Sequence, residues 1–107
     1  EQLSIARHEV ELNLDELIDI SSKLVKDRGY FYLVHRADRL SEILVTLQKY
    51  NFEAKKIKFC YTTKYKNAKI VLIEAIKNGK SGLTILPPLI INKDNGEYTD
   101  EVLKMFE

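Results

Sequence analysis

Apolar side chains recur at helical spacing in the first segment of the chain. Between residues 14 and 25 they return every three or four positions, which is the repeat of one face of a helix. Asn13 precedes this segment and Glu16 follows three residues later, as in a capping box. Lys26, Arg28 and then Gly29 are typical of a helix end. We therefore predict a helix that begins after Asn13 and stops at Gly29.

A second helix is predicted over residues 38–50. Leu40, Ile43, Leu44 and Leu47 would share one face of it. Asn51 is a suitable terminator, because asparagine tolerates the left-handed conformation that ends many helices.

Three segments have the pattern of strands. Residues 30–34 form an unbroken apolar run, typical of a parallel strand that is buried on both faces. In residues 55–61 apolar Ile57, Phe59 and Tyr61 alternate with more polar neighbours, which predicts a half-buried strand at a sheet edge. Residues 69–76 form another buried apolar strand, near enough in sequence to make an antiparallel hairpin with the preceding one.

The remaining residues, 83–107, read as an irregular tail of the same domain. Pro87 and Pro88 exclude a helix there and disfavour a central strand. The sequence Asp94-Asn95-Gly96 predicts a turn, and residues 99–106 could form a short closing helix. The order helix, strand, helix, strand, strand predicts an α/β fold with one right-handed crossover. The last two predicted strands form a hairpin, whereas in a simple doubly wound sheet a helix would lie between them.

Length and composition limit the class of protein. The 107 residues, 45% apolar and 31% charged, suit one small globular domain or a piece of a larger one. No apolar run approaches the roughly 20 residues of a membrane span, and the first residues do not resemble a signal peptide. The single cysteine, Cys60, suits a reducing compartment and is more typical of a core than of a nucleophile. We expect a cytoplasmic protein without a membrane partner, and two widely spaced histidines predict no metal site.

Basic charge is concentrated in one stretch. Residues 54–80 carry eight lysines and one acid, Glu74, whereas the rest of the chain carries nine basic and fifteen acidic residues. Lysines that alternate with aromatic residues can neutralise phosphates while a ring stacks on an unpaired base. A lysine-rich solvated face is the alternative interpretation. The candidate RNA-binding residues are Lys55, Lys56, Lys58, Lys64, Tyr65, Lys66 and Lys69.

A second group of polar residues marks a candidate pocket. His35 and Arg36 directly follow the predicted strand 30–34, and ligands of α/β sheets bind outside the carboxyl ends of the strands. Arg7, His8 and Glu9 lie just ahead of the first helix. The alternative is that the arginines are surface charges and that His35 only ends its strand.

Several segments, taken in order, resemble one family. They are residues 6–9 (ARHE), 34–36 (VHR) with 39–40 (RL), 71–75 (VLIEA), 86–89 (LPPL) and 96–99 (GEYT). Together they resemble the C-terminal half of the bacterial family that methylates the exocyclic amine of adenine in a valine tRNA. That resemblance implies a Rossmann-like methyltransferase sheet with two helices here and parallel strands that end in an antiparallel hairpin. The strands 30–34, 55–61 and 69–76 would be its fifth, sixth and seventh.

The resemblance also implies what this chain lacks. The family binds S-adenosylmethionine through a glycine-rich loop and holds adenine with an Asn-Pro-Pro-aromatic motif, and the sequence contains neither. We therefore expect a single partial domain with no catalytic or cofactor-binding residues and no activity alone. It would contribute pocket rim and tRNA-facing lysines to a parent enzyme that uses S-adenosylmethionine. Its partners would be tRNA, the missing N-terminal half and, when isolated, a second copy. The alternatives are an independent nucleic-acid-binding module and a structural fragment.

Overall fold

The computed structural model describes residues 13–106, which form two main helices against a small sheet. The helices are α2 (Leu14–Leu24) and α3 (Leu40–Lys49), the latter preceded by the 3-10 turn η1 (Ala37–Arg39). The long strands are β1 (Tyr30–Arg36), β2 (Phe52–Tyr61) and β3 (Ile70–Lys77). Two short strands, β4 (Thr84–Ile85) and β5 (Leu89–Ile90), and the helix α4 (Asp100–Lys104) follow. Over this stretch, every helix falls short of the length and apolar character needed to cross a membrane.

The last long strand lies in the middle of the sheet. β3 runs antiparallel to both β1 and β2 and separates them, so β1 and β2 are parallel to each other with α3 as their crossover. The predicted hairpin is thus confirmed, and so is the α/β fold class. β4 and β5 pair in parallel with the outer side of β2, so this strand is not the edge that we predicted.

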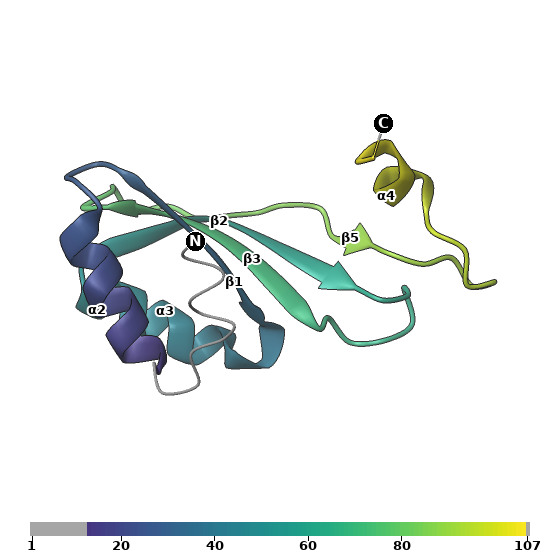
Figure 1. The fold of residues 1–107 in the computed structure, drawn as a ribbon, viewed down its shortest axis with the longest axis horizontal. Helices are drawn as coiled ribbons and strands as arrows, with labels where there is room; N and C mark the ends of the chain where they lie inside the picture. The colour runs from purple at the N-terminus through teal and green to yellow at the C-terminus, as the bar shows by residue number, and fades with distance from the viewer. Residues whose placement is uncertain (1–12, 107) are drawn as a thin grey trace.

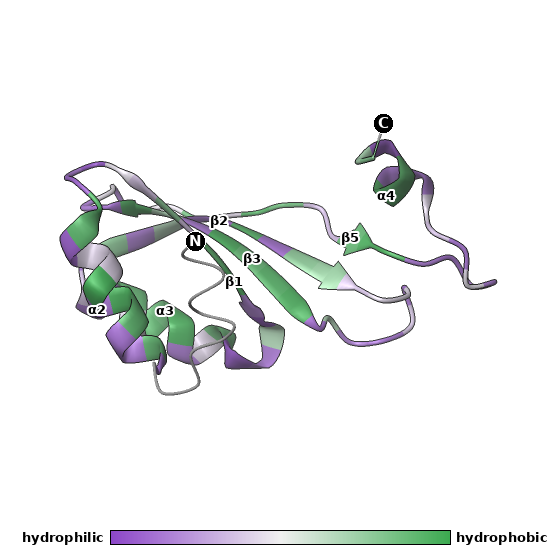
Figure 2. Cartoon of the chain, in the orientation of Figure 1, coloured by the Kyte–Doolittle hydropathy of each residue, from purple (hydrophilic) through white to green (hydrophobic). Residues whose placement is uncertain are grey.

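The main core lies between the helices and one face of the sheet. Figure 1 shows α2 and α3 on the same side of the long strands. Ile18 from α2, Ile43 and Leu47 from α3, and Ile57 and Ile73 from the strands are almost completely buried there. Burial of side chains of this size contributes about 1.5–3 kcal/mol each. Figure 2 shows that the surfaces of α2 and α3 turned away from the sheet are more hydrophilic.

The opposite face of β1 is open, which corrects one prediction. Phe31 and Leu33 are buried, but Tyr30, Tyr32 and Val34 are exposed, with 64% of Tyr32 accessible. The expectation that this strand is buried on both faces was therefore wrong. β3 likewise buries Val71, Ile73 and Ala75 on the helix side only. An apolar run indicates a strand with both faces covered. For β1, the described residues supply a covering layer on the helix side only.

Local signals placed the start of α2 and the end of α3 correctly, but they placed the end of α2 too late. The Asn13 side chain accepts from the Glu16 N–H at 2.8 Å, and the Asn13 N–H donates to the Glu16 carboxylate at 3.1 Å, which confirms the capping box. α2 ends at Leu24 rather than near Gly29. Arg28, with φ of 66°, is the left-handed residue of the turn that leads into β1. Asn51, with φ of 68°, follows α3 as predicted.

The C-terminal residues cover one corner of the sheet. Leu89 and Val102 pack against Cys60 in a second, smaller core on the side opposite the helices. The Lys58 ammonium lies 3.5 Å from the Glu101 carboxylate and links β2 to α4. The predicted turn at residues 94–96 and the short helix after residue 99 are both present.

Candidate functional site

The topology brings two predicted groups of residues to one edge of the sheet. Ile70 of β3 is paired with Arg36 on one side and with Cys60 on the other. The Ala37 N–H donates to the Lys69 carbonyl at 2.9 Å, which joins the end of β1 to the loop after β2. The carboxyl end of β1 and the loop of residues 62–69 therefore lie next to each other.

The surroundings of His35 at this edge favour its neutral form. Its Nδ1 accepts the Arg36 N–H at 2.8 Å, so the ring hydrogen of the neutral tautomer lies on Nε2. Burial lowers the pKa of His35 and the positive charge of Arg39 lowers it further. A neutral imidazole with a free Nε2–H can donate a hydrogen bond to a ligand. The exposed guanidinium of Arg36 lies 2.6 Å from the Asp38 carboxylate, which restricts its orientation.

The other three residues of the predicted pocket rim are not placed. Arg7, His8 and Glu9 fall outside the described residues. Their assignment to the rim stays a prediction.

Four of the seven candidate RNA-binding residues lie together on the loop between β2 and β3. Lys64, Tyr65, Lys66 and Lys69 are all exposed. The Lys64 ammonium lies 5.1 Å from the centre of the Tyr65 ring, within cation–π distance. With 74% of its surface accessible, Tyr65 offers a ring on which an unpaired base can stack.

The other three lysines lie elsewhere. Lys56 and Lys58 are on the open face of the sheet near Tyr32 and Glu74. The register shift between Ala54 and Lys56 sets Lys55 apart, and its ammonium lies 2.8 Å from the Lys80 carbonyl at the opposite end of β2. The structure thus divides the lysines into a loop group, a sheet-face group and one anchored residue.

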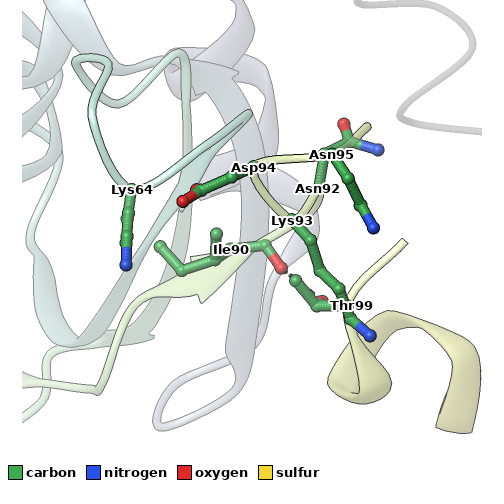
Figure 3. Close-up of a pocket in the computed structure, with 7 residues that line it drawn as sticks. All are labelled: Lys64, Ile90, Asn92, Lys93, Asp94, Asn95 and Thr99. Atoms are coloured by element: carbon green, nitrogen blue, oxygen red, sulfur yellow. Dashed lines mark hydrogen bonds between the residues drawn. The ribbon is translucent and has the colours of Figure 1, made fainter. Parts of the chain in front are cut away.

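A cavity that sequence reasoning missed adjoins the loop group. Its volume is about 450 Å³, and it lies between Lys64 on one side and the Ile90–Thr99 segment on the other. Figure 3 shows the Asp94 carboxylate pointing toward the side of the opening that carries Lys64, with Ile90 below them. The Tyr65 hydroxyl donates to the Asp94 carboxylate at 3.3 Å, so the two sides touch. The turn at residues 94–96 was visible in the sequence, but its place beside Lys64 depends on β5 pairing with β2.

Residues 13–106 offer neither a reactive thiol nor a cluster of metal ligands. Cys60 is buried, and burial raises the pKa of its thiol, which disfavours the reactive thiolate. Among residues 13–106, His, Cys, Asp and Glu side chains form no group of three or more that could hold a metal ion.

The comparison of structures supports the fold. No protein-family model and no curated protein sequence matches the chain. A solved structure of a predicted O-methyltransferase from Agrobacterium tumefaciens superposes with a TM-score of 0.76 at 22% identity. The match covers 86% of this chain but only 44% of that protein. The chain therefore has a methyltransferase-like fold and spans less than half the length of this neighbour.

Proposed function

We propose that this chain is the C-terminal portion of an S-adenosylmethionine-dependent tRNA adenine-N6 methyltransferase. In this proposal it supplies a pocket rim and an RNA-facing surface, and it has no activity by itself. The observation that carries it is the antiparallel β3 between the parallel strands β1 and β2, which agrees with the closing hairpin of the methyltransferase sheet. The similarity to a predicted O-methyltransferase supports the same assignment at the level of the fold.

The RNA part of the proposal is supported by the loop group. Lys64, Lys66 and Lys69 are three exposed cations on the same loop as Tyr65, at the edge that also carries His35 and Arg36. Cations bind phosphates, and an exposed aromatic ring stacks on a base that has left its helix. An enzyme that modifies a base needs such a surface beside its pocket, because the target base must be moved out of the stack.

The cofactor would be held by residues other than those described. Dinucleotide and nucleoside cofactors of such sheets bind at a glycine-rich turn between a strand and the following helix. Within residues 13–106, β1 is followed by Ala37 and Asp38 and not by glycine, and Gly79 and Gly82 lie beyond β3 at the opposite edge. The residues present do not suit S-adenosylmethionine, so no chemical step is assigned to this chain.

The remaining parts of the proposal concern partners and location. We propose that the chain works in the cytoplasm with tRNA and with an N-terminal half that carries the cofactor site. In isolation it would associate with a second copy through the open side of β1.

Two binding measurements test this function. Fluorescence anisotropy should detect tRNA binding that weakens steeply as salt rises, with a perfectly paired RNA duplex of equal length binding less tightly. Calorimetry should give a dissociation constant for S-adenosylmethionine no tighter than millimolar. A micromolar constant for the cofactor would contradict the partial-enzyme proposal, and equal affinity for duplex and tRNA would leave the lysines as a solvated face.

A further inference from the structure

The cavity beside the loop group has two walls from distant parts of the sequence. One wall is the loop after β2, which presents Lys64. The other is the segment after β5, which turns back on itself so that Asn92 pairs with Tyr98. Its volume of about 450 Å³ lies within the range of roughly 300–1,000 Å³ that is typical of small-molecule sites.

Backbone hydrogen bonds fix both walls to the same strand. The Ile91 N–H donates to the Tyr61 carbonyl at 2.9 Å, and the Asn92 N–H donates to the Thr62 carbonyl at 2.8 Å. These bonds continue the parallel pairing of β2 and β5 into the cavity. The cavity is therefore formed by the fold itself and is not a gap between independent loops.

The second wall is stabilised by its own contacts. The Lys93 N–H donates to the Glu97 carbonyl at 2.7 Å, and the Asn92 amide donates to the Gly96 carbonyl at 3.1 Å. The Thr99 hydroxyl donates to the Ile90 carbonyl at 2.6 Å, which closes the base of this segment (Figure 3). These contacts hold the segment in shape and occupy the Asn92 amide and the Thr99 hydroxyl, so a ligand would meet the side chains of Lys64, Ile90 and Asp94.

The available groups have a specific combination of chemistry. Ile90 gives the cavity an apolar surface, Lys64 brings positive charge, and Asp94 brings a carboxylate that points toward Lys64, whereas the Lys93 ammonium lies 3.9 Å from the Asp100 carboxylate. An aromatic ring, Tyr65, is attached to the carboxylate side by its hydroxyl. Cations bind phosphate, and apolar and aromatic surfaces bind the flat face of a base. A carboxylate accepts hydrogen bonds from the exocyclic amine of a base.

We propose that this cavity is a subsite for one unpaired nucleotide whose base carries an exocyclic amine. The proposal rests on the RNA-facing role given above and deepens it by naming the unit that is bound. The base lies against Ile90 beside Tyr65 and donates its amine hydrogens to the Asp94 carboxylate. The phosphate lies toward the Lys64 ammonium.

A titration with mononucleotides tests the subsite without RNA. Adenosine monophosphate added to the full chain should shift the backbone amide signals of Asp94, Asn95 and Gly96 and of the loop at Lys64. Uridine monophosphate, which has no exocyclic amine, should bind at least about fivefold more weakly. Inorganic phosphate alone should shift the Lys64 loop only.

Two variants make the test specific. In Asp94→Asn, which keeps an oxygen that can accept from Tyr65, adenosine and uridine monophosphates should bind within about twofold of each other. Lys66→Ala removes a neighbouring cation that does not line the cavity, so it should leave the ratio of the two affinities unchanged. The same amide spectra show whether each variant is folded.

The outcomes separate this proposal from the RNA-facing role. Absence of shifts at residues 94–96, or an adenosine preference that survives in Asp94→Asn, overturns the subsite even if tRNA binds. Selective binding of adenosine monophosphate by a chain that does not bind tRNA would support the subsite and reject the tRNA role.

Discussion

At the scale of single residues, His35 shows how partial burial and a neighbouring positive charge disfavour protonation. The ring accepts the Arg36 N–H through Nδ1, and a proton on that atom would break the bond. Partial burial and the nearby Arg39 also disfavour the charged ring, and together they lower the pKa of His35. The folded protein therefore favours neutral histidine more than the unfolded chain does.

The pH dependence of stability follows from that shift. The unfolded chain takes up a proton near the ordinary histidine pKa of about 6.5, before the folded chain does. The contribution of His35 to stability is thus present above this pH and is lost as the pH falls through the lower folded pKa. Magnetic resonance titration of the His35 ring should give a midpoint below 6.5. In His35→Gln the fall in unfolding temperature between pH 7 and pH 5 should be smaller, and a midpoint at or above 6.5 would contradict the assignment.

The division of the lysines gives a matched test of the RNA-facing loop. Replacing Lys64 and Lys66 with alanine should weaken tRNA binding and reduce the slope of log affinity against log salt by about 0.7–0.9 for each phosphate that the variant no longer neutralises. Lys55→Ala is the control, since that ammonium is bound to the Lys80 carbonyl at the other end of β2. Anisotropy titrations at several salt concentrations measure both. Equal slopes for all three proteins would favour a merely solvated loop.

At the scale of elements, the N-terminus of α2 carries the strongest local determinant. The reciprocal bonds of Asn13 and Glu16 satisfy two backbone donors that otherwise lack partners within the helix. Asp15 and Glu16 also place negative charge in the first turn, where the helix dipole favours it.

Removing this cap should lower stability by a modest, defined amount. Asn13→Ala should reduce the free energy of unfolding by about 1 kcal/mol, while Asn13→Gly should cost only a few tenths. Lys23→Ala on the exposed side of the same helix is the control and should stay within about 0.5 kcal/mol of the original chain. Urea unfolding curves measure the three differences. Equal effects of alanine and glycine at position 13 would show that the cap is not responsible.

The sequence predicted the helices and strands better than it predicted which of their faces are buried and which segments pack beside them. Helical spacing, the capping box and the β2–β3 hairpin are local or nearly local signals, and all three are present in the structure. The burial of Tyr32 was predicted wrongly, because an apolar strand does not reveal whether its second covering layer belongs to the described residues. The cavity was missed because it needs β5 to pair with β2 across a long connection, and no local pattern specifies that pairing. The place of Lys55 depends on one register shift that alternation alone cannot reveal.

At the scale of the whole molecule, the two edges of the three long strands differ in whether a further strand pairs with them. The outer side of β2 carries β4 and β5, whereas β1 is paired only with β3 among residues 13–106. Exposed Tyr30, Tyr32 and Val34 follow the open strand, and Leu24 of α2 is exposed nearby. Strands with an unpaired edge and apolar side chains are templates for another chain.

The isolated chain should therefore associate, most simply as a two-fold dimer that covers β1. Sedimentation velocity should show a dimer whose fraction grows with concentration. Val34→Lys, on the open strand, should shift the protein toward monomer, because a charge on an edge strand opposes pairing. Val45→Lys, at a well-solvated position on α3, should change nothing. A monomer at high micromolar concentration would contradict this prediction, because β1 would then be stable with its edge unpaired.

The central position of β3 also has a consequence for the order in which the sheet assembles. β1 and β2 lie two strand spacings apart, roughly 10 Å, and share no ladder of their own. During synthesis, α3 can bring the two strands to the same side, but the space between them stays empty until residue 77 has been made. The β2–β3 hairpin closes over a short loop, whereas β1 must pair with a partner about 40 residues further along the chain, which is slower. We therefore expect the hairpin to be structured in the folding transition state and β1 to add afterwards, so that mutations in β1 mainly accelerate unfolding.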